Sequence, residues 1–305
     1  MSDSKGTAAK KSDFLLNFFL GGTSGAISKT VSAPLERVKL LLQTQHSNAQ
    51  LVGKNYKGFV DCFIRVYKEE GVAAYWKGNW ANVIRYFPTT AFNFAFKDIL
   101  NKYFNVYDSK KEPTKFFIAN LLSGGFAGMG STIFVYPLDF ARTRMGIDVG
   151  RKGATQFNSL SHCLSSIYRT DGIRGIYQGI GVSLVSVFGY RSMYFGLWDT
   201  AKSKFTDYDS QSLGLKFLLA QVITTSSESI NYPLDTVRRR LMMNSGLKVP
   251  IYPSTWYCIK AIKREEGIKG FYKGCMSNAI RSVSSSLVLV LYDEMMRLYV
   301  YTSKK

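Results

Sequence analysis

One stretch of the chain is apolar on all faces over an unusual length. Residues 116–136 carry no charged side chain, and a helix needs about 20 such residues to cross the ~30 Å hydrocarbon core of a bilayer. Five weaker apolar stretches are interrupted or bounded by a charge: 14–27, 86–96, 181–190, 217–227 and 282–292. Helices of this kind are expected to face lipid on one side and a watery cavity on the other. The pattern predicts six membrane helices, with the core helices of a soluble protein as the alternative.

Two motifs recur together three times along the chain. A Pro-x-acid-x-x-base motif begins at Pro34, Pro137 and Pro233. An acid-Gly motif that ends in a second glycine occupies residues 70–78, 171–179 and 266–274. Repeats of fixed period indicate structural units that stack on one another. We expect a polar extension at 1–12, followed by repeats at 13–112, 113–211 and 212–305.

Each repeat predicts the same series of elements. A membrane helix containing a proline is followed by a loop, a short amphipathic helix such as 59–69, a turn bounded by glycine and a second membrane helix. The predicted fold is therefore an all-α membrane protein with six transmembrane helices. They form three pseudo-symmetric repeats around a central cavity, together with three short amphipathic helices.

The charge of the chain points to an anionic partner. Lys and Arg number 40 against 21 Asp and Glu, which gives a net charge of +19. Nucleic acid, membrane lipid or a charged metabolite would fit this excess. With two His and four Cys and no Cys-x-x-Cys pair, no metal site is expected. Cys62, Cys163 and Cys258 recur in step with the repeats and are expected to be buried packing residues without disulfides.

The acid and base of the proline motif lie three residues apart and so share one helix face. Three copies on three helices predict a ring of alternating charges. Charges at membrane depth are costly unless they are paired, so a ring of pairs that forms and breaks would act as a gate. Ion pairs on the surface after helix ends are the alternative. The ring would contain Glu36, Lys39, Asp139, Arg142, Asp235 and Arg238.

These motifs and their ~100-residue period resemble the mitochondrial carrier family over about residues 13–300. Only the second repeat departs from the acid-Gly motif, with Gln178 where the family has a base. The stretches 28–30, 34–43, 82–89 and 235–243 are similar to the branch of that family which exchanges ADP for ATP. The last of these, D-T-V-R-R-R-L-M-M, resembles a signature of that branch at Arg238, Arg239, Arg240, Leu241, Met242 and Met243.

The resemblance implies a multi-pass antiporter of the mitochondrial inner membrane that exchanges ADP for ATP by alternating access between salt-bridge gates. It implies no enzymatic activity and no cofactor, and the sequence contains no phosphate-binding Gly-rich loop or nucleophile–base pair that would suggest otherwise. Bound cardiolipin is expected, and nucleic acid is not. The alternatives are a carrier of another anionic nucleotide, or a non-transporting structural subunit of a larger inner-membrane complex.

Site residues follow from the same resemblance. Those implied to bind substrate are Lys29, Arg85, Ser186, Val187, Tyr190, Asn231 and Arg281. The charge ring would be the matrix gate, with pairs Glu36–Arg142, Asp139–Arg238 and Asp235–Lys39 braced by Gln43. A cytoplasmic gate would use Asp98, Lys102, Asp199, Lys202, Asp293 and Arg297. Cardiolipin would bind near Gly58, Gly78, Gly179 and Gly274.

Several residues depart from the family pattern. Ser186 and Asn231 stand where the family has smaller side chains. The cytoplasmic gate has Asn101 and Met296 at expected base positions, with the compensating Lys102 and Arg297 one residue later. Glu228 shares a helix face with Asn231 and Asp235 and would repel a polyphosphate unless paired. We hypothesise that it modulates the cavity through an ion pair with Lys29 or Arg281.

Overall fold

The computed structural model describes residues 2–51, 53–104, 112–149, 155–204 and 213–283. Within these ranges the chain is helical or irregular and contains no strand, as the all-α prediction requires. The long helices are α1 (Ser2–Thr44), α3 (Asn79–Phe104), α4 (Pro113–Gly146), α6 (Ile180–Lys204) and α7 (Leu213–Met242). The short ones are α2 (Phe59–Glu70), α5 (Leu160–Ile176), α8 (Thr255–Glu266) and α9 (Ile268–Phe271). Residues 275–283 form a further helical segment.

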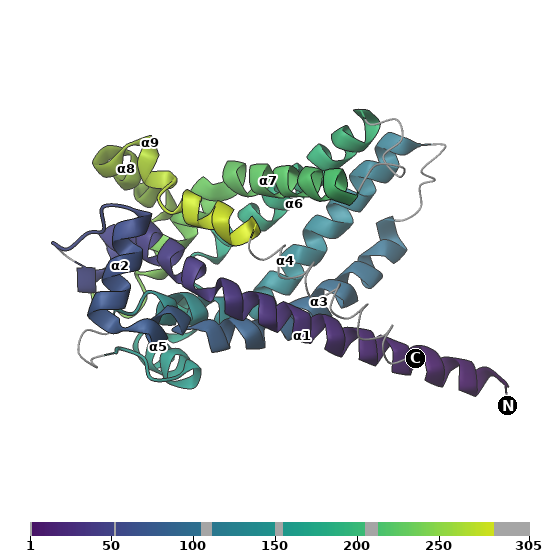
Figure 1. Ribbon diagram of the computed structural model, residues 1–305, viewed down its shortest axis with the longest axis horizontal. Coiled ribbons are helices and arrows are strands. Elements are labelled where there is room, and N and C mark those ends of the chain that lie inside the picture. Colours follow the sequence, from purple (N-terminus) through teal and green to yellow (C-terminus); the bar gives the residue numbers. More distant parts are fainter. Residues whose placement is uncertain (1, 52, 105–111, 150–154, 205–212, 284–305) are drawn as a thin grey trace.

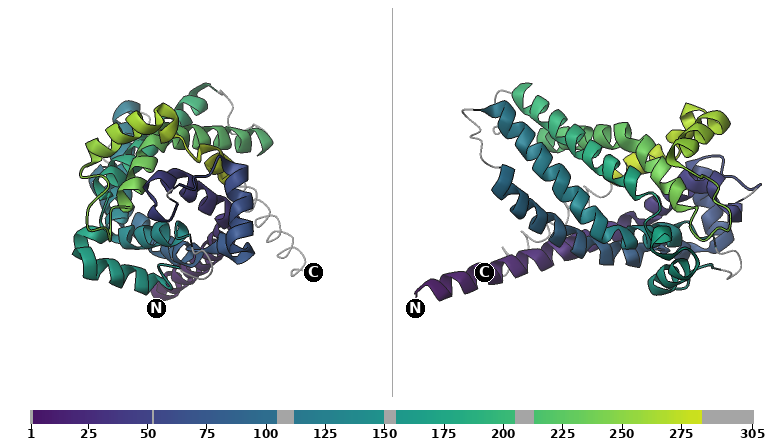
Figure 2. Two further views of the ribbon diagram at one scale, coloured as in Figure 1. Left: turned by 90° about the vertical axis from the view of Figure 1, so that its left-hand side faces the viewer. Right: turned by 180° about the vertical axis from the view of Figure 1, so that it is seen from behind.

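Between α1 and α3 the chain also forms three short 3₁₀ helices, η1 (Gln45–Ser47), η2 (Ala49–Leu51) and η3 (Val72–Trp76). The short elements α2, α5, α8 and α9 gather at one end of the molecule, on the left of Figure 1. The view from that end in Figure 2 (left) shows helices arranged in a ring around the centre. Each motif proline lies inside a long helix, as expected: Pro34 in α1, Pro137 in α4 and Pro233 in α7.

Among the described helices, α4 alone is long and apolar enough by itself to cross a membrane, over Thr114–Gly146. The fully apolar stretch 116–136 lies inside it. The other long helices contain charged residues in their spans, such as Lys29 in α1, Arg85 in α3 and Glu228 in α7. The number of membrane-spanning helices therefore remains a prediction.

Three apolar clusters attach the short helices to the ends of α1, α4 and α7. The first packs Val66 of α2 against Leu41 of α1, and it includes Ile147 and Met243, which follow α4 and α7. The second and third are built in the same way around α5 and α8. A fully buried cysteine lies in each cluster: Cys62, Cys163 and Cys258. All three are free thiols, so the prediction of buried packing residues is confirmed.

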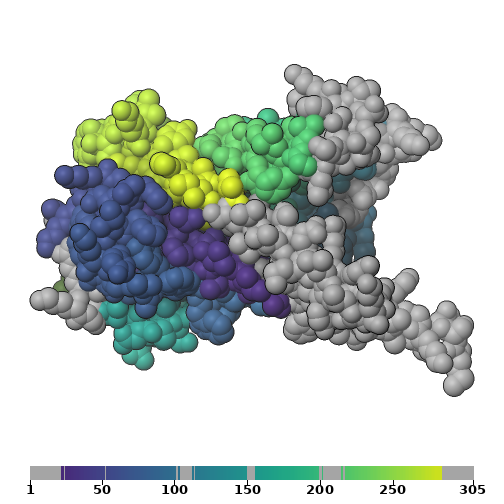
Figure 3. Space-filling view, in the orientation of Figure 1, coloured from purple at the N-terminus to yellow at the C-terminus, as the bar shows by residue number. Residues whose placement is uncertain are grey.

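The outer side of α2 carries an apolar strip. Val60, Ile64 and Tyr67 are exposed there, and their spacing of four and three residues places them on one side of the helix. In the space-filling view this helix lies at the surface between α1 and the end of the molecule (Figure 3). The predicted amphipathic helix thus has one face on the core, and its outward side combines this apolar strip with exposed charges at Lys68 and Glu69.

Three turn glycines bring the repeats into backbone contact. Gly78, Gly179 and Gly274 have φ of +79°, +85° and +84°, a region that favours glycine. A Cβ at Gly78 would lie 2.9 Å from the carbonyl oxygen of Arg142, and one at Gly274 would lie 3.0 Å from that of Lys39. At Gly179 the same close approach, 3.0 Å, involves the carbonyl of Arg238. Each turn therefore abuts the motif base of the following repeat, in a closed cycle.

Buried ion pairs link two of the acid-Gly turns to the long helices. Arg37 of α1 donates to both carboxylate oxygens of Glu70, at 2.9 and 2.8 Å, and Lys77 pairs with the same carboxylate at 2.6 Å. Arg240 of α7, Glu266 and Lys273 repeat this arrangement.

The second repeat has Gln178 in place of the lysine, and no such ion pair of Asp171 is seen among the described residues. Asp171, the acid of its acid-Gly motif, instead accepts a 2.6 Å hydrogen bond from the backbone N–H of Gly246. Arg144, also in this repeat, lies over the ring of Phe157 with 5.6 Å between the guanidinium carbon and the ring centre. The departure noted in the sequence therefore replaces a buried ion pair with other contacts.

We expect the three repeat cysteines to resist alkylation in the folded protein. Burial raises the pKa of Cys62, Cys163 and Cys258 to about 12, and the thiolate is the reactive form. Maleimide labelling at pH 8, read by mass spectrometry, should leave these three unmodified until the protein is unfolded. Rapid labelling of any of them in the folded protein would contradict this.

We expect Glu266→Gln to destabilise the protein by roughly 3 kcal/mol at pH 7, because it leaves Arg240 buried without its carboxylate. Burial acts to raise the pKa of Glu266, but the bonds and charges of Arg240 and Lys273 outweigh it and lower the pKa from 4.5 to about 2. The stabilisation is then complete above pH 4.5 and disappears as the pH falls toward 2. Melting curves of both proteins should converge over that interval; a constant difference would show that the carboxylate charge is irrelevant.

Candidate functional site

A cavity of about 640 Å³ lies among the long helices, within the size range of small-molecule sites. Its lining comes from α1, α3, α4, α6, α7 and the segment 275–283. All seven residues implied to bind substrate line it: Lys29, Arg85, Ser186, Val187, Tyr190, Asn231 and Arg281. The structure thus brings together side chains that are up to 252 positions apart in the sequence.

The six residues of the predicted charge ring also line this cavity. All three expected pairs are present, and each joins two different helices. Arg142 of α4 pairs with Glu36 of α1. The second pair joins Arg238 Nη2 of α7 and Asp139 Oδ2 of α4 at 3.3 Å, and the third joins Lys39 Nζ of α1 and Asp235 Oδ2 of α7 at 3.0 Å. The pairs connect α1, α4 and α7 in a closed ring.

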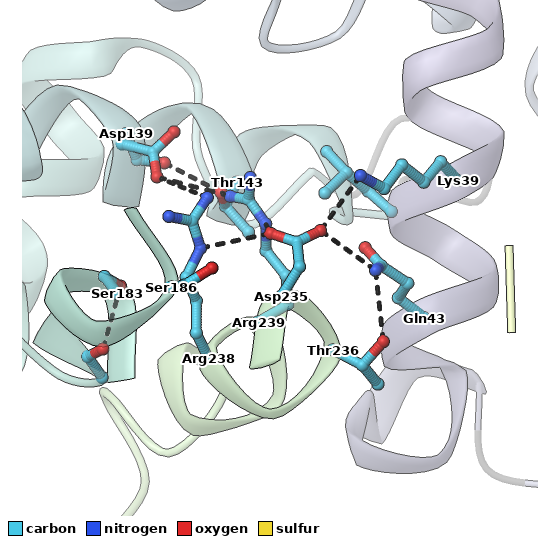
Figure 4. Close-up of polar contacts among 12 residues, drawn as sticks. Lys39, Gln43, Asp139, Thr143, Ser183, Ser186, Asp235, Thr236, Arg238 and Arg239 are labelled. Atoms are coloured by element: carbon cyan, nitrogen blue, oxygen red, sulfur yellow. Dashed lines mark hydrogen bonds and ion pairs between the residues drawn. The ribbon is translucent and has the colours of Figure 1, made fainter. Parts of the chain in front are cut away.

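Gln43 braces the ring, as the resemblance implied. Its amide nitrogen lies 3.2 Å from Oδ2 of Asp235 and 3.3 Å from Oγ1 of Thr236. Figure 4 shows this amide and Lys39 reaching the same carboxylate from α1. Gln43 is fully buried, so the bond replaces water that the amide cannot reach.

Arg239 is a member of the ring that the proline motif does not identify. Its guanidinium lies 3.6 Å from Asp139 and 3.6 Å from Asp235, and it also donates to Thr143 (Figure 4). It therefore bridges two of the three ring acids. Its position four residues after Asp235 on one helix face, inside a run of three arginines, is the sequence signal that could have indicated this role.

Two asparagines connect the ring to the cavity cations. Asn82 donates to Glu36 at 3.0 Å, and its carbonyl oxygen accepts from Arg142 at 2.8 Å and from Arg85 at 3.4 Å. Asn82 and Asn278 lie four residues after the turn glycines Gly78 and Gly274, and neither was among the expected site residues.

Asn278 occupies the equivalent place in the third repeat. Its carbonyl oxygen accepts from Lys39 at 2.9 Å and from Arg281 Nη2 at 3.2 Å. In each of the two repeats an asparagine therefore touches at least one ring residue and one cavity arginine. A change at either arginine can reach the ring through a single amide.

One wall of the cavity is aromatic. The rings of Tyr190, Tyr194 and Trp198 on α6 stack in series, with 6.1 Å between successive ring centres. Val187 and Phe195 lie on the same stretch of cavity wall. Arg191, which was not among the expected site residues, also lines the cavity and donates to Asn93 at 3.3 Å. Cations beside stacked aromatic rings suit a ligand that combines anionic groups with a planar ring.

Three residues of the cavity that depart from the family pattern, Ser186, Asn231 and Glu228, contact one another or a cavity cation. Asn231 of α7 donates to the backbone oxygen of Ser186 at 2.9 Å and to its hydroxyl at 2.7 Å. Glu228 pairs with Arg281, with 3.1 Å between Oε1 and Nη2. Of the two partners expected for Glu228, the structure shows Arg281, and the role of this pair in modulating the cavity stays a hypothesis.

The predicted cytoplasmic gate lies mostly outside the described residues. Asp98 and Lys102 are exposed near the end of α3. The side chains of Asp199 and Lys202 are not described, and Asp293 and Arg297 fall outside the described ranges. This gate stays a prediction.

A second cavity, of about 480 Å³, lies between the first and third repeats. Two of the glycines expected near cardiolipin, Gly58 and Gly274, line it together with Lys57 and Lys273. Lys273 Nζ also lies 2.6 Å from Nε2 of His46. Its lysines would suit an anionic headgroup, but lipid binding stays a prediction.

Comparison with known proteins agrees with the resemblance seen in the sequence motifs. The family model described as "Mitochondrial carrier protein" matches three segments, residues 10–108, 113–209 and 209–303. The chain is 53% identical over 290 residues to the mitochondrial substrate carrier family protein ancA of Dictyostelium discoideum, covering 94% of each chain. It is 50% identical to ADP/ATP translocase 2 of Bos taurus, covering 92% of this chain and 96% of the relative. It is also 49% identical to an ADP,ATP carrier protein of Parachlorella kessleri, over 95% and 86%.

We expect Arg239→Ala to lower the stability of the described conformation by roughly 3 kcal/mol, because it leaves Asp139 and Asp235 undercompensated in a buried site. The measurement is thermal unfolding of the purified protein in detergent. Arg264→Ala removes an exposed arginine, 75% accessible, and should change stability by less than about 0.5 kcal/mol. Equal melting temperatures for the two variants would show that Arg239 does not hold the ring together.

Proposed function

Because the chain belongs to the mitochondrial carrier protein family, a family of transporters, we propose that it exchanges ADP for ATP across the mitochondrial inner membrane. The observation that carries this proposal is the arrangement in one cavity of the cations Lys29, Arg85 and Arg281, an aromatic wall and a closed charge ring. No covalent chemistry is needed. The relatives named ADP/ATP translocase, which match over more than nine-tenths of the chain, support the choice of substrate.

The cations would bind the phosphates. Lys29, Arg85 and Arg281 come from the first, second and sixth predicted membrane helices and line the same cavity. Arginine can bind phosphate oxygens bidentately, and a nucleotide polyphosphate offers several of them. The adenine would pack against Tyr190 and Val187 on α6, where the stacked rings begin.

The charge ring would act as the matrix gate. It joins α1, α4 and α7 where those helices meet the short elements. In the proposed fold, six transmembrane helices form three repeats around the cavity, and the cavity is shut on the matrix side while the ring is intact. Contacts between substrate and cations would offset the free energy needed to break the ion pairs. The gate would therefore open only when substrate is bound in the cavity.

When the matrix gate opens, the second gate would close on the cytoplasmic side through Asp98, Asp199 and Asp293 with Lys102, Lys202 and Arg297. ATP carries one more negative charge than ADP, so the membrane potential would drive the exchange. Cardiolipin would hold the short matrix-side helices, and the second cavity, with Gly58, Gly274 and two lysines in its lining, is where we place one such lipid.

A carrier for a different anionic nucleotide is the second candidate. Two observations favour it. Glu228 forms an ion pair with Arg281, one of the cations expected to bind phosphate. Asn231 and Ser186, which are bonded to each other, line the same cavity as the aromatic side chains. Thermal stabilisation of the purified protein by a panel of nucleotides separates the candidates, because a ligand that binds the folded state raises the melting temperature.

We expect the purified protein in liposomes to take up labelled ADP only when ADP or ATP is inside. Arg85→Ala should reduce the exchange rate roughly 100-fold by removing a charged contact to phosphate. Arg174→Ala, an exposed arginine on α5, is the matched control and should exchange normally. Absence of exchange by folded wild-type protein would overturn the proposed function.

A further inference from the structure

The three repeats carry very different side chains at one equivalent cavity position. The residue five positions before the motif proline is Lys29 in the first repeat, Thr132 in the second and Glu228 in the third. All three line the central cavity. Corresponding points of the cavity wall thus present a cation, a hydroxyl and an anion.

The anion lies against one particular cation. Glu228 Oε1 is 3.1 Å and Oε2 is 3.4 Å from Nη2 of Arg281. Asn278 holds the carboxylate from the other side, with Nδ2 at 2.6 Å from Oε2. The side chains of Glu228 and Arg281 are only 21% and 15% exposed. The pair is therefore largely shielded from water and supported by a further bond.

Arg281 and Arg85 occupy equivalent positions, seven residues after the turn glycines, but they have different partners. The acid nearest Arg85 is Asp139, which belongs to the charge ring, with 3.8 Å between Nε and Oδ1. Arg281 instead faces Glu228, which lies outside the ring. Glu228 is therefore an added charge whose pairing is not needed to close the ring.

A carboxylate bound to a guanidinium occupies the directions that a phosphate oxygen would use. Both carboxylate oxygens of Glu228 face Nη2 of Arg281. A polyphosphate that binds this nitrogen must displace Glu228, and the displaced carboxylate then lies beside the phosphates. Separating Glu228 from Arg281 costs free energy because the buried carboxylate is left without its partner. The repulsion between the carboxylate and the ligand grows with the number of negative charges on the ligand.

We propose that Glu228 is a tethered competitor for Arg281, so that the cavity discriminates against the more highly charged of two nucleotides. This inference rests on the proposed function, since it names a charge preference of the same site. Glu228 is then a specificity-determining residue of the carrier. A merely structural role would make Glu228 affect the affinities of all nucleotides equally or not at all.

Glu228→Gln tests the proposal, because glutamine keeps an oxygen that can accept from Asn278 but loses the charge. Dissociation constants for AMP, ADP and ATP are measured by calorimetry on wild-type and variant protein at fixed salt. The expected gain in affinity rises along that series, to roughly tenfold for ATP. Equal factors for the three nucleotides, or no change, would overturn the proposal.

Glu265→Gln is the matched control, since it removes one carboxylate from an exposed position, 57% accessible, on α8. Its three dissociation constants should equal those of the wild type, and a rising series in this variant too would overturn the proposal by showing a general charge effect. If Glu228→Gln fails to fold, Glu228→Thr introduces the residue that the second repeat carries at this position, and the same series is expected.

The two proposals fail separately. Wild-type protein that is folded but neither binds nor exchanges adenine nucleotides would overturn the proposed function. Wild-type protein that exchanges ADP for ATP, with an unchanged ratio of affinities in Glu228→Gln, would overturn only the role of Glu228.

Discussion

The structure depends on the pairing of charges in a place where water cannot compensate them. Asp139, Arg142 and Arg239 are all buried, and each is acceptable there only because an opposite charge from another helix meets it. The pairing sets how far α1, α4 and α7 can separate and in which register they meet. The apolar clusters then attach one short helix to the end of each, so the shape of this end follows from the ring.

The charges of the ring are paired, whereas the cavity as a whole carries an excess of positive charge. Cations outnumber anions among its lining residues, and an excess of buried charge of one sign is a standing cost to the folded state. An anionic ligand reduces that cost, and the asparagines that touch both the cations and the ring provide a short physical connection between the two. Binding and opening can then share one network without a long-range rearrangement.

Much of this arrangement could be predicted because it is local and repeated. A three-residue spacing puts acid and base on one helix face, and three copies predict the pairs between Glu36 and Arg142 and their equivalents. The four-residue spacing in α7 could indicate the contact of Arg239 with Asp235. The contact of Arg239 with Asp139 and the connecting role of Asn82 depend on distances between helices, which no spacing in the sequence contains. For the same reason the sequence left Lys29 and Arg281 as alternative partners of Glu228, and only packing decides between them.

The contacts at the turn glycines limit how the repeats can move. At Gly78, Gly179 and Gly274 the backbone of one repeat rests on the carbonyl of the next, with no side chain between them. Because the contacts run from each repeat to the following one and back to the first, the three interfaces form a closed mechanical loop. A displacement at one interface must be accommodated at the other two. The geometry of these contacts therefore couples the three repeats, so that a tilt of one requires a tilt of the other two.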